Sequence, residues 1–300
     1  MNPRKPLTAL FLGAPNPLSM GMIAAWLHAG NRVEAIWFPE RVKATPAIEK
    51  DIRMADINPN LSMVGLANQF EVTCEPVSKL SGNPALVARA KDLAPDVVIS
   101  VMFMDIIPNT MIEAFKGTLL NIHPSLLPAY RGPSPILNML WDEKIDEFSG
   151  LTLHEITAGV DEGPIVKSLP VAFPKNGAMG HYIGAMIPAG GKLLCETVPA
   201  YLGGSIIAVE QPLSGVSHCH VKIGNLTIGR ADSRARVEWL CRTVGQFAEF
   251  KTERSLASVR VNRLVEVLGS PTGQPINYSD GWIEIDLADA RVRLSRSQIG

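Results

Sequence analysis

The sequence predicts an α/β fold, a doubly wound and mostly parallel sheet, followed by a smaller β-rich domain. Residues 7–13, 19–28 and 32–38 read as strand, helix and strand, the opening unit of a parallel sheet. Residues 96–104 are almost continuously apolar, which is typical of a central parallel strand covered on both faces. From residue 208 the composition becomes polar and rich in turn residues, which indicates that the first domain has ended.

Composition restricts the class of protein. With 300 residues, 46% hydrophobic and 19% charged, the chain has core material for two modest domains. A net charge of −1 argues against a protein that coats nucleic acid, and four scattered cysteines predict neither a disulfide framework nor a zinc site. No apolar run approaches the roughly 20 residues of a membrane span, and prolines follow the short run 7–13, which is therefore a core strand rather than a signal peptide. We expect a cytoplasmic protein with no membrane partner.

The remaining elements of the first domain are inferred from hydrophobic periodicity and from glycine and proline stops. In chain order we expect a short helix at 48–54, a strand at 71–75, a helix at 83–93, a strand at 118–122, a helix at 133–141, strands at 150–156 and 165–173, and a helical segment at 179–202. Pro188 and the pair Gly190–Gly191 should interrupt this last segment. The turn at Gly13 could cradle an anion, although a simple tight turn explains it better.

The domain organisation follows from these elements. We expect a catalytic domain at 1–207, a linker at 208–221 and a smaller carboxyl-terminal domain at 222–300. The smaller domain should hold one helix and then β structure, with the helix at 233–247 and strands at 258–268, 282–287 and 290–295. Within the linker, His218-Cys219-His220 offers soft metal ligands, but no second pair follows at zinc spacing, so we predict a surface strand and no metal.

The strand at 118–122 organises the functional prediction. Asn121 and His123 are two residues apart, so their side chains leave an extended backbone on the same face. Polar side chains at the carboxyl end of a buried strand are where open α/β sheets place their ligand chemistry. Asp161 lies later in the chain between glycines, in Ala-Gly-Val-Asp-Glu-Gly-Pro. An amide, an imidazole and a carboxylate together could polarise a carbonyl and move a proton.

Three motifs in this order resemble the folate-dependent formyltransferase family. They are Asn-x-His-Pro-Ser-Leu-Leu-Pro followed by Tyr-Arg-Gly, then Gly-Leu-Thr-Leu-His, then Gly-Val-Asp-Glu-Gly-Pro-Ile-Val, and the resemblance is strongest over about residues 95–170. The family includes glycinamide ribonucleotide, methionyl-tRNA and amino-sugar N-formyltransferases. The resemblance implies a Rossmann-like catalytic domain, an OB-like carboxyl-terminal domain and formyl transfer from 10-formyltetrahydrofolate without a metal.

The resemblance also implies roles for particular residues. Asn121 would hold the developing oxyanion, His123 would donate to the same oxygen or relay a proton, and Asp161 would orient the imidazole and accept the proton of the amine. Arg131 could hold an acidic substrate group or form a surface ion pair. Folate contacts are expected from the end of the strand at 96–104 with the loop that follows it, and from the three motifs: Met104, Ile106, Ile107, Ser125, Leu126, Leu127, Pro128, His154, Gly159 and Val160. For His154 a structural role explains the sequence equally well.

The sequence leaves the formyl acceptor open. Methionyl-tRNA formyltransferases usually carry a Pro-Asp-Arg-Pro-x-Gly-Arg-Gly type of loop, whereas this chain has only Pro-Glu-Arg-Val-Lys at 39–43. We therefore expect a small acceptor, such as a nucleotide-linked amino sugar or an N-hydroxylated amino acid, with tRNA as the alternative. A formyltetrahydrofolate hydrolase and a non-catalytic folate-binding protein are further alternatives; the hydrolases usually carry an extra domain in front, whereas this sheet begins by residue 7. A homodimer is compatible with the sequence.

Overall fold

The computed structural model describes residues 5–43, 46–59, 62–222, 226–245, 250–252 and 260–296. The chain forms two compact units. Unit 1 comprises Met1–Pro133, Phe148–Ala172 and Ile183–His218, and unit 2 comprises Ser134–Glu147, Phe173–Tyr182 and Cys219–Gly300. Each unit consists of three segments that alternate with those of the other unit along the sequence. The division into continuous domains at 1–207 and 222–300 stays a prediction.

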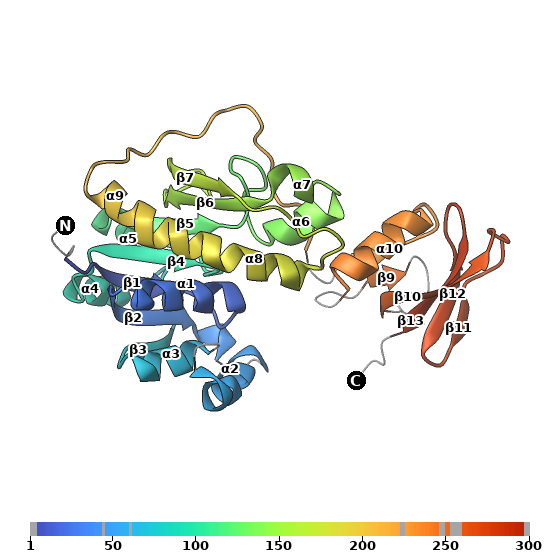
Figure 1. The fold of residues 1–300 in the computed structure, drawn as a ribbon, viewed down its shortest axis with the longest axis horizontal. Helices are drawn as coiled ribbons and strands as arrows, with labels where there is room; N and C mark the ends of the chain where they lie inside the picture. Colours follow the sequence, from blue (N-terminus) through green and yellow to red (C-terminus); the bar gives the residue numbers. More distant parts are fainter. Residues whose placement is uncertain are drawn as a thin grey trace. The chain divides into compact units, whose positions relative to one another are not determined.

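Unit 1 is built on a seven-stranded sheet in the order β3-β2-β1-β4-β5-β6-β7 (Figure 1). Its strands are β1 (Thr8–Leu12), β2 (Arg32–Pro39), β3 (Thr73–Val77), β4 (Val97–Val101), β5 (Leu119–His123), β6 (Gly150–Glu155) and β7 (Ile165–Pro170). The first five in spatial order are parallel, and β6 and β7 are antiparallel to their neighbours. The order reverses direction between β1 and β4, so this is the doubly wound, mostly parallel sheet that the sequence predicts.

Helices cover both faces of this sheet. Successive residues of β1 point to opposite sides, so apolar side chains need cover on each face. On one side the ring of Phe11 meets the edge of Trp26 from α1 (Pro17–His28), with ring centroids 6.2 Å apart. On the other side Leu10 and Leu12 belong to a buried cluster with residues of α4 (Pro84–Asp92) and α5 (Asn109–Ala114). The central parallel strands β1 and β4 are therefore buried on both faces, which explains their apolar sequences.

The long helical segment differs from the expected one. The helix α8 (Met179–Lys192) runs through Pro188 and both glycines, and continues through a π-helical turn at Leu193–Thr197 into α9 (Val198–Leu202). The expected interruption is wrong because the glycines permit close packing rather than a break. A Cβ on Gly190 would lie 2.1 Å from Met22 Cε of α1, and one on Gly21 would lie 2.4 Å from Ile187 Cγ2 of α8. Figure 1 shows α1 and α8 side by side.

The expected strands and helices of unit 1 are otherwise confirmed to within a few residues, and several short helices were not predicted. The additional elements are a 3-10 turn at Glu40–Val42, α3 (Met63–Gln69) and α5, besides the expected α2 (Pro46–Ile57). At the segment Ser134–Glu147, which belongs to unit 2, α6 (Pro135–Trp141) was expected and α7 (Ile145–Phe148) was not. The helix α3 begins on a buried carboxylate, since Asp51 accepts hydrogen bonds from Ser62 Oγ and from the amides of Met63 and Val64. An acidic group at a helix N-terminus satisfies amides that have no partner within the helix.

Unit 2 contains the helix α10 (Arg234–Thr243) and a six-stranded sheet in the order β11-β12-β13-β10-β9-β8. Its strands are β8 (Thr227–Ile228), β9 (Phe250–Thr252), β10 (Arg260–Gly269), β11 (Asn277–Ser279), β12 (Trp282–Asp286) and β13 (Arg291–Arg296). All pairings are antiparallel except that of β8 with β9. This confirms the smaller β-rich domain, with β8, β9 and β11 as strands that the sequence did not indicate.

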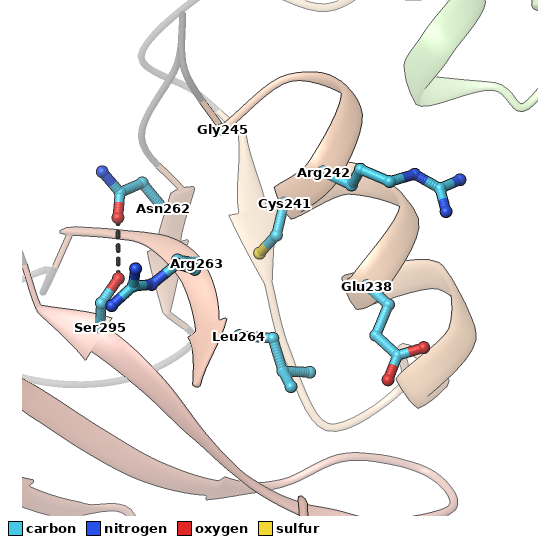
Figure 2. A pocket seen from close by; sticks show the side chains of 8 residues that line it. All are labelled: Glu238, Cys241, Arg242, Gly245, Asn262, Arg263, Leu264 and Ser295. Atoms are coloured by element: carbon cyan, nitrogen blue, oxygen red, sulfur yellow. Dashed lines mark hydrogen bonds between the residues drawn. The ribbon is translucent and has the colours of Figure 1, made fainter. Parts of the chain in front are cut away.

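A pocket of 710 Å³ lies between α10 and β10 in unit 2 (Figure 2). Its lining residues are Glu238, Cys241, Arg242, Gly245, Asn262, Arg263, Leu264 and Ser295. Ser295 Oγ donates to Asn262 Oδ1 at 2.7 Å at one end of this pocket. Burial raises the pKa of the Cys241 thiol to about 11, which outweighs the opposing hydrogen bond to the backbone of Leu264.

No helix within the described ranges is long and apolar enough to cross a membrane.

Candidate active site

The strand β5 places two polar side chains at the carboxyl edge of the unit 1 sheet. Residues Asn121 and His123 end β5, and the parallel pairing of β4 with β5 brings the loop after Val101 to the same edge. The antiparallel strand β6 sets His154 directly opposite Asn121. Directly paired residues on neighbouring strands point to the same side, so His154 joins Asn121 and His123 on one face.

A strained turn delivers the carboxylate. Asp161 adopts a positive φ of 54°, a left-handed conformation that Asp tolerates better than most residues. Neither Gly159 nor Gly163 has a positive φ, so these glycines do not supply the left-handed residue. Gly163 has a different reason to be glycine, because a Cβ there would lie 1.9 Å from the carbonyl oxygen of Glu155. The turn is therefore pressed against the end of β6 and directs Asp161 back towards β5.

The three residues predicted to be catalytic meet on the carboxylate of Asp161. Asn121 Nδ2 donates to Asp161 Oδ1 at 3.3 Å, and His123 Nδ1 lies 3.4 Å from Asp161 Oδ2. Two further groups join them: His154 Nε2, which lies 3.5 Å from Asp161 Oδ1, and the amide of Gly132, which donates to Oδ2 at 2.8 Å. The structure thus brings the predicted triad together and adds His154 to it by direct contact.

Hydrogen bonds assign the tautomers of both histidines. His154 Nδ1 lies 2.8 Å from the carbonyl oxygen of Glu155 and must donate to it, so Nε2 accepts from Asn121 Nδ2 at 3.1 Å. His123 Nε2 lies 2.8 Å from the carbonyl oxygen of Tyr130 and carries a proton for the same reason. The Nδ1 atom of His123 is then the site where a second proton would bind, facing Asp161.

Burial and charge act in opposite directions on this cluster. Burial lowers the pKa of His123, outweighing the Asp161 carboxylate and the carbonyl of Tyr130, which raise it. Burial alone would raise the pKa of Asp161, but the two histidines and the Gly132 amide stabilise the ionised form and hold that pKa well below its usual range. At neutral pH the site therefore pairs an ionised carboxylate with a histidine that is free to take up a proton.

Arg131 does not face an open binding surface. Its side chain is only 10% exposed. Its Nε and Nη2 atoms donate to Gln211 Oε1 at 3.1 and 2.8 Å, and Nη1 lies 3.4 Å from Glu162 Oε1. Sequence reasoning missed Gln211, the Tyr130 carbonyl and the Gly132 amide. The first lies in a segment without local periodicity, and backbone groups carry no signal in a sequence.

The residues expected to contact folate fall into three groups by exposure. Met104, Ile106 and Val160 are exposed by 51%, 78% and 62%, although each is a large apolar side chain. Ser125 and Leu127 are buried inside the loop after β5, where Ser125 Oγ donates to the carbonyl of Ala129 at 2.7 Å. The others are half-buried except His154, which is 2% exposed: Ile107, Leu126, Pro128 and Gly159.

The part of the chain that the structure describes contains no group of three His, Cys, Asp or Glu side chains arranged to hold a metal ion. In the stretch His218-Cys219-His220, where we predict a surface strand, His218 forms an isolated parallel bridge with Arg131. His220 Nε2 lies 3.4 Å from Asp142 Oδ1 within unit 2.

Comparison with known proteins finds similarity to formyl transferases. Residues 65–177 match the family described as formyl transferase. Methionyl-tRNA formyltransferase of Chloroflexus aggregans is 34% identical over 199 residues, which cover 66% of this chain and 60% of that protein. The corresponding protein of Herpetosiphon aurantiacus is 32% identical over 136 residues, which cover 45% of this chain and 44% of that protein. The chain spans about half the length of the curated relatives that it matches.

Solved structures share the fold. The N-formyltransferase from Helicobacter canadensis, in complex with folinic acid and dTDP-3-aminofucose, superposes with a TM-score of 0.64 at 15% identity and covers 97% of this chain and 100% of its own. HypX from Aquifex aeolicus in complex with tetrahydrofolic acid gives a TM-score of 0.62 at 15% identity over 96% of this chain and 43% of its own. The family match over residues 65–177 and the curated relatives thus show that this part of the chain is similar to formyl transferases, and the solved structures show the same fold.

Proposed function

We propose that this protein transfers a formyl group from 10-formyltetrahydrofolate to a primary amine or hydroxylamine. The observation that carries the proposal is the convergence of Asn121, His123 and His154 on the carboxylate of Asp161, at the carboxyl edge of the sheet. Formyl transfer requires a neutral donor for a developing oxyanion and an acceptor for the proton of the attacking amine. This cluster contains both within one hydrogen-bonded group.

Each side chain has a distinct part in the proposed reaction. The amine nitrogen attacks the formyl carbon, and the electron pair of the carbonyl moves to its oxygen, where the amide of Asn121 stabilises the charge. Asp161 and the neighbouring Nδ1 of His123 take the proton that the amine loses. The bond from the formyl carbon to N10 then breaks and N10 receives a proton, so the products are an N-formyl amine and tetrahydrofolate.

Asn121 must exchange a partner during this reaction. Its Nδ2 already donates to His154 Nε2 and to Asp161 Oδ1, which uses both of its hydrogens. Donation to the formyl oxygen therefore replaces one of these hydrogen bonds. The developing oxyanion accepts a charge-assisted hydrogen bond, which offsets the one that is lost.

The formyl donor fits the exposed apolar side chains of the same edge. Met104 and Ile106 lie in the loop after β4, and Val160 precedes Asp161. All three are large apolar side chains exposed by half or more, and a flat pterin ring has the apolar faces to cover such surface. Neutral backbone groups of the same loops would contact its polar edge.

For the acceptor we propose a small amine, with initiator tRNA as the alternative. The stretch Pro39–Lys43 has one arginine, and Arg41 Nε is paired with Asp105 Oδ1 at 3.0 Å within unit 1. A paired arginine offers less charge to a phosphate backbone, and the net charge of −1 adds no general attraction. The tRNA alternative is favoured by the curated relatives, which are named methionyl-tRNA formyltransferases.

The test incubates the purified protein with 10-formyltetrahydrofolate and four acceptor conditions: nucleotide-linked amino sugars, N-hydroxylated amino acids, charged initiator tRNA and no acceptor. We expect catalytic formylation of a small amine, and near-complete loss of turnover in Asn121→Ala and His123→Ala with folding retained. Catalytic formylation of the tRNA alone would reverse the order of the two acceptors. Formate release without an acceptor would indicate a hydrolase, and tight folate binding without any turnover would indicate a non-catalytic binding protein.

A further inference from the structure

The segment that the sequence suggests is a linker is hydrogen-bonded along the active site. We call residues 209–218 the strap. At its start, Val209 and Ile165 exchange two backbone hydrogen bonds of 2.7 and 2.9 Å. At its end, the amide of Arg131 donates to the carbonyl of Ser217 at 2.9 Å, and the amide of Ser217 donates to the carbonyl of Pro128 at 3.3 Å. The strap is therefore attached both to the strand after the Asp161 turn and to the loop after His123.

Gln211 joins these two parts of the site. Its Nε2 atom donates to the carbonyl oxygens of Asp161 and Gly163, both at 2.8 Å. Its Oε1 atom accepts from two nitrogens of the Arg131 guanidinium, at 2.8 and 3.1 Å. Both amide hydrogens and both acceptor positions of the side chain are thus used, and the neighbour of Arg131, Gly132, is the residue whose amide holds the Asp161 carboxylate.

The other end of the strap supports the histidine. Tyr130 has a positive φ of 58°, and its amide donates to Ser217 Oγ at 2.9 Å. The carbonyl of Tyr130 in turn accepts from His123 Nε2. Two backbone positions of the site are left-handed: Tyr130, whose carbonyl accepts from His123, and Asp161, which carries the carboxylate. Non-glycine residues keep this conformation only where the surroundings hold them. The strap supplies hydrogen bonds to each.

We propose that Gln211 is a positioning residue that fixes the backbone of the Asp161 turn, so that the carboxylate faces His123 and Asn121. This inference rests on the proposed function. Gln211 contacts the carbonyl of Asp161 rather than its carboxylate, so it acts through that residue and not on substrate. Misplacing a reacting group by about 1 Å can reduce turnover by about 10²-fold, which sets the size of the expected effect.

Two substitutions separate the parts of this contact. Gln211→Ala removes all four hydrogen bonds. Gln211→Glu keeps an acceptor, now charged, for Arg131, but replaces the donor with an oxygen that faces the carbonyls of Asp161 and Gly163. Gln69→Ala, at the exposed end of α3, is the matched control. We expect both Gln211 variants to lower kcat by about 10- to 100-fold with the KM for the formyl donor within about threefold, and the control to match the wild type.

A second measurement does not depend on turnover. NMR of protein labelled in its histidine rings follows the titration of His123, and loss of the Asp161 carboxylate from its Nδ1 should lower the pKa of His123 further in both Gln211 variants. If Gln211→Glu restores wild-type kcat and an unchanged titration, the donors to the turn are not what matters and the proposal is overturned. The proposal also fails if Gln211→Ala leaves both measurements unchanged. A wild-type protein that formylates no acceptor refutes the proposed function, while the NMR result still decides the role of Gln211.

Discussion

Replacing Asp161 by asparagine should reduce activity far more than it reduces stability. The carboxylate accepts from the Gly132 amide at 2.8 Å and from Asn121 Nδ2 at 3.3 Å, and it faces Nδ1 of His123 and Nε2 of His154. An asparagine has only one acceptor oxygen. If that oxygen faces Gly132, the new NH₂ group points at the NH₂ group of Asn121, and the reverse orientation meets the amide of Gly132 instead.

The expected magnitudes follow from that conflict. Losing one hydrogen bond to a charged acceptor costs about 1.5–3 kcal/mol, and removing a largely buried charge recovers part of this. We expect Asp161→Asn to lower the free energy of unfolding at pH 7 by about 1–2 kcal/mol, which leaves most molecules folded. Turnover should fall by about 10²–10⁴-fold, since a positioned acid or base contributes that much.

The difference in unfolding free energy between wild type and Asp161→Asn should become smaller at low pH. The pKa of Asp161 is depressed in the folded protein, so its contribution to stability is complete above the unfolded pKa of about 3.9 and is lost as the pH falls further. Urea unfolding should show a difference between wild type and Asp161→Asn that is equal at pH 7 and pH 5.5 and smaller at pH 3. Asp92→Asn, at the exposed end of α4, should change neither turnover nor this profile. A difference that is constant down to pH 3, or an Asp161→Asn enzyme with more than about a tenth of wild-type kcat, would refute the reasoning.

Three further predictions concern other groups. Gly163→Ala should lower the free energy of unfolding by about 1–3 kcal/mol in thermal melts, because its Cβ would lie 1.9 Å from a backbone oxygen of Glu155. The control is Gly184→Ala in α8, where the added Cβ would meet no atom within 4 Å. This control should be neutral or stabilising in the same measurement. With a pKa of about 11, Cys241 should be about 0.1% thiolate at pH 8. Mass spectrometry should therefore show that the Cys241 thiol is alkylated at least about tenfold more slowly in the folded protein than in urea. Equal alkylation rates in the two conditions would contradict its burial. Burial depresses the pKa of His123, so the folded state resists the protonation that the unfolded state undergoes below about pH 6.5. The free energy of unfolding of the wild type should therefore fall from pH 7.5 to 5.5, and that of His123→Asn should fall less. An equal change of unfolding free energy with pH in both proteins would contradict this.

Much of the fold could be predicted because its signals are local. The apolar runs that became β1, β2, β4 and β5 are buried on both faces, and their composition shows it directly. The helix α4 begins after Asn83, which accepts from the amide of Leu86 as an N-cap should. The break expected in α8 failed because glycine has two uses, and only the position of Met22 on a neighbouring helix decides between them.

The candidate site divides in the same way. Asn121 and His123 could be paired from their spacing on one strand, since residues two apart share a face whatever the strand packs against. His154 is near them because β6 returns antiparallel beside β5, and this pairing is set by the sheet rather than by any residue around His154. Gln211 gave no signal at all, because its partners are a guanidinium and two carbonyls far away in the chain.

The sequence by itself determined the strand that carries Asn121 and His123, the family motifs and the turn that holds Asp161, because each depends on residues within one short stretch. Only the tertiary structure decided that Asp161 is left-handed, that His154 touches it and that the strap runs beside it. The physical reason is that backbone carbonyls and amides make these contacts as much as side chains do. Every residue carries such groups, so which of them meet depends on how the chain folds in three dimensions.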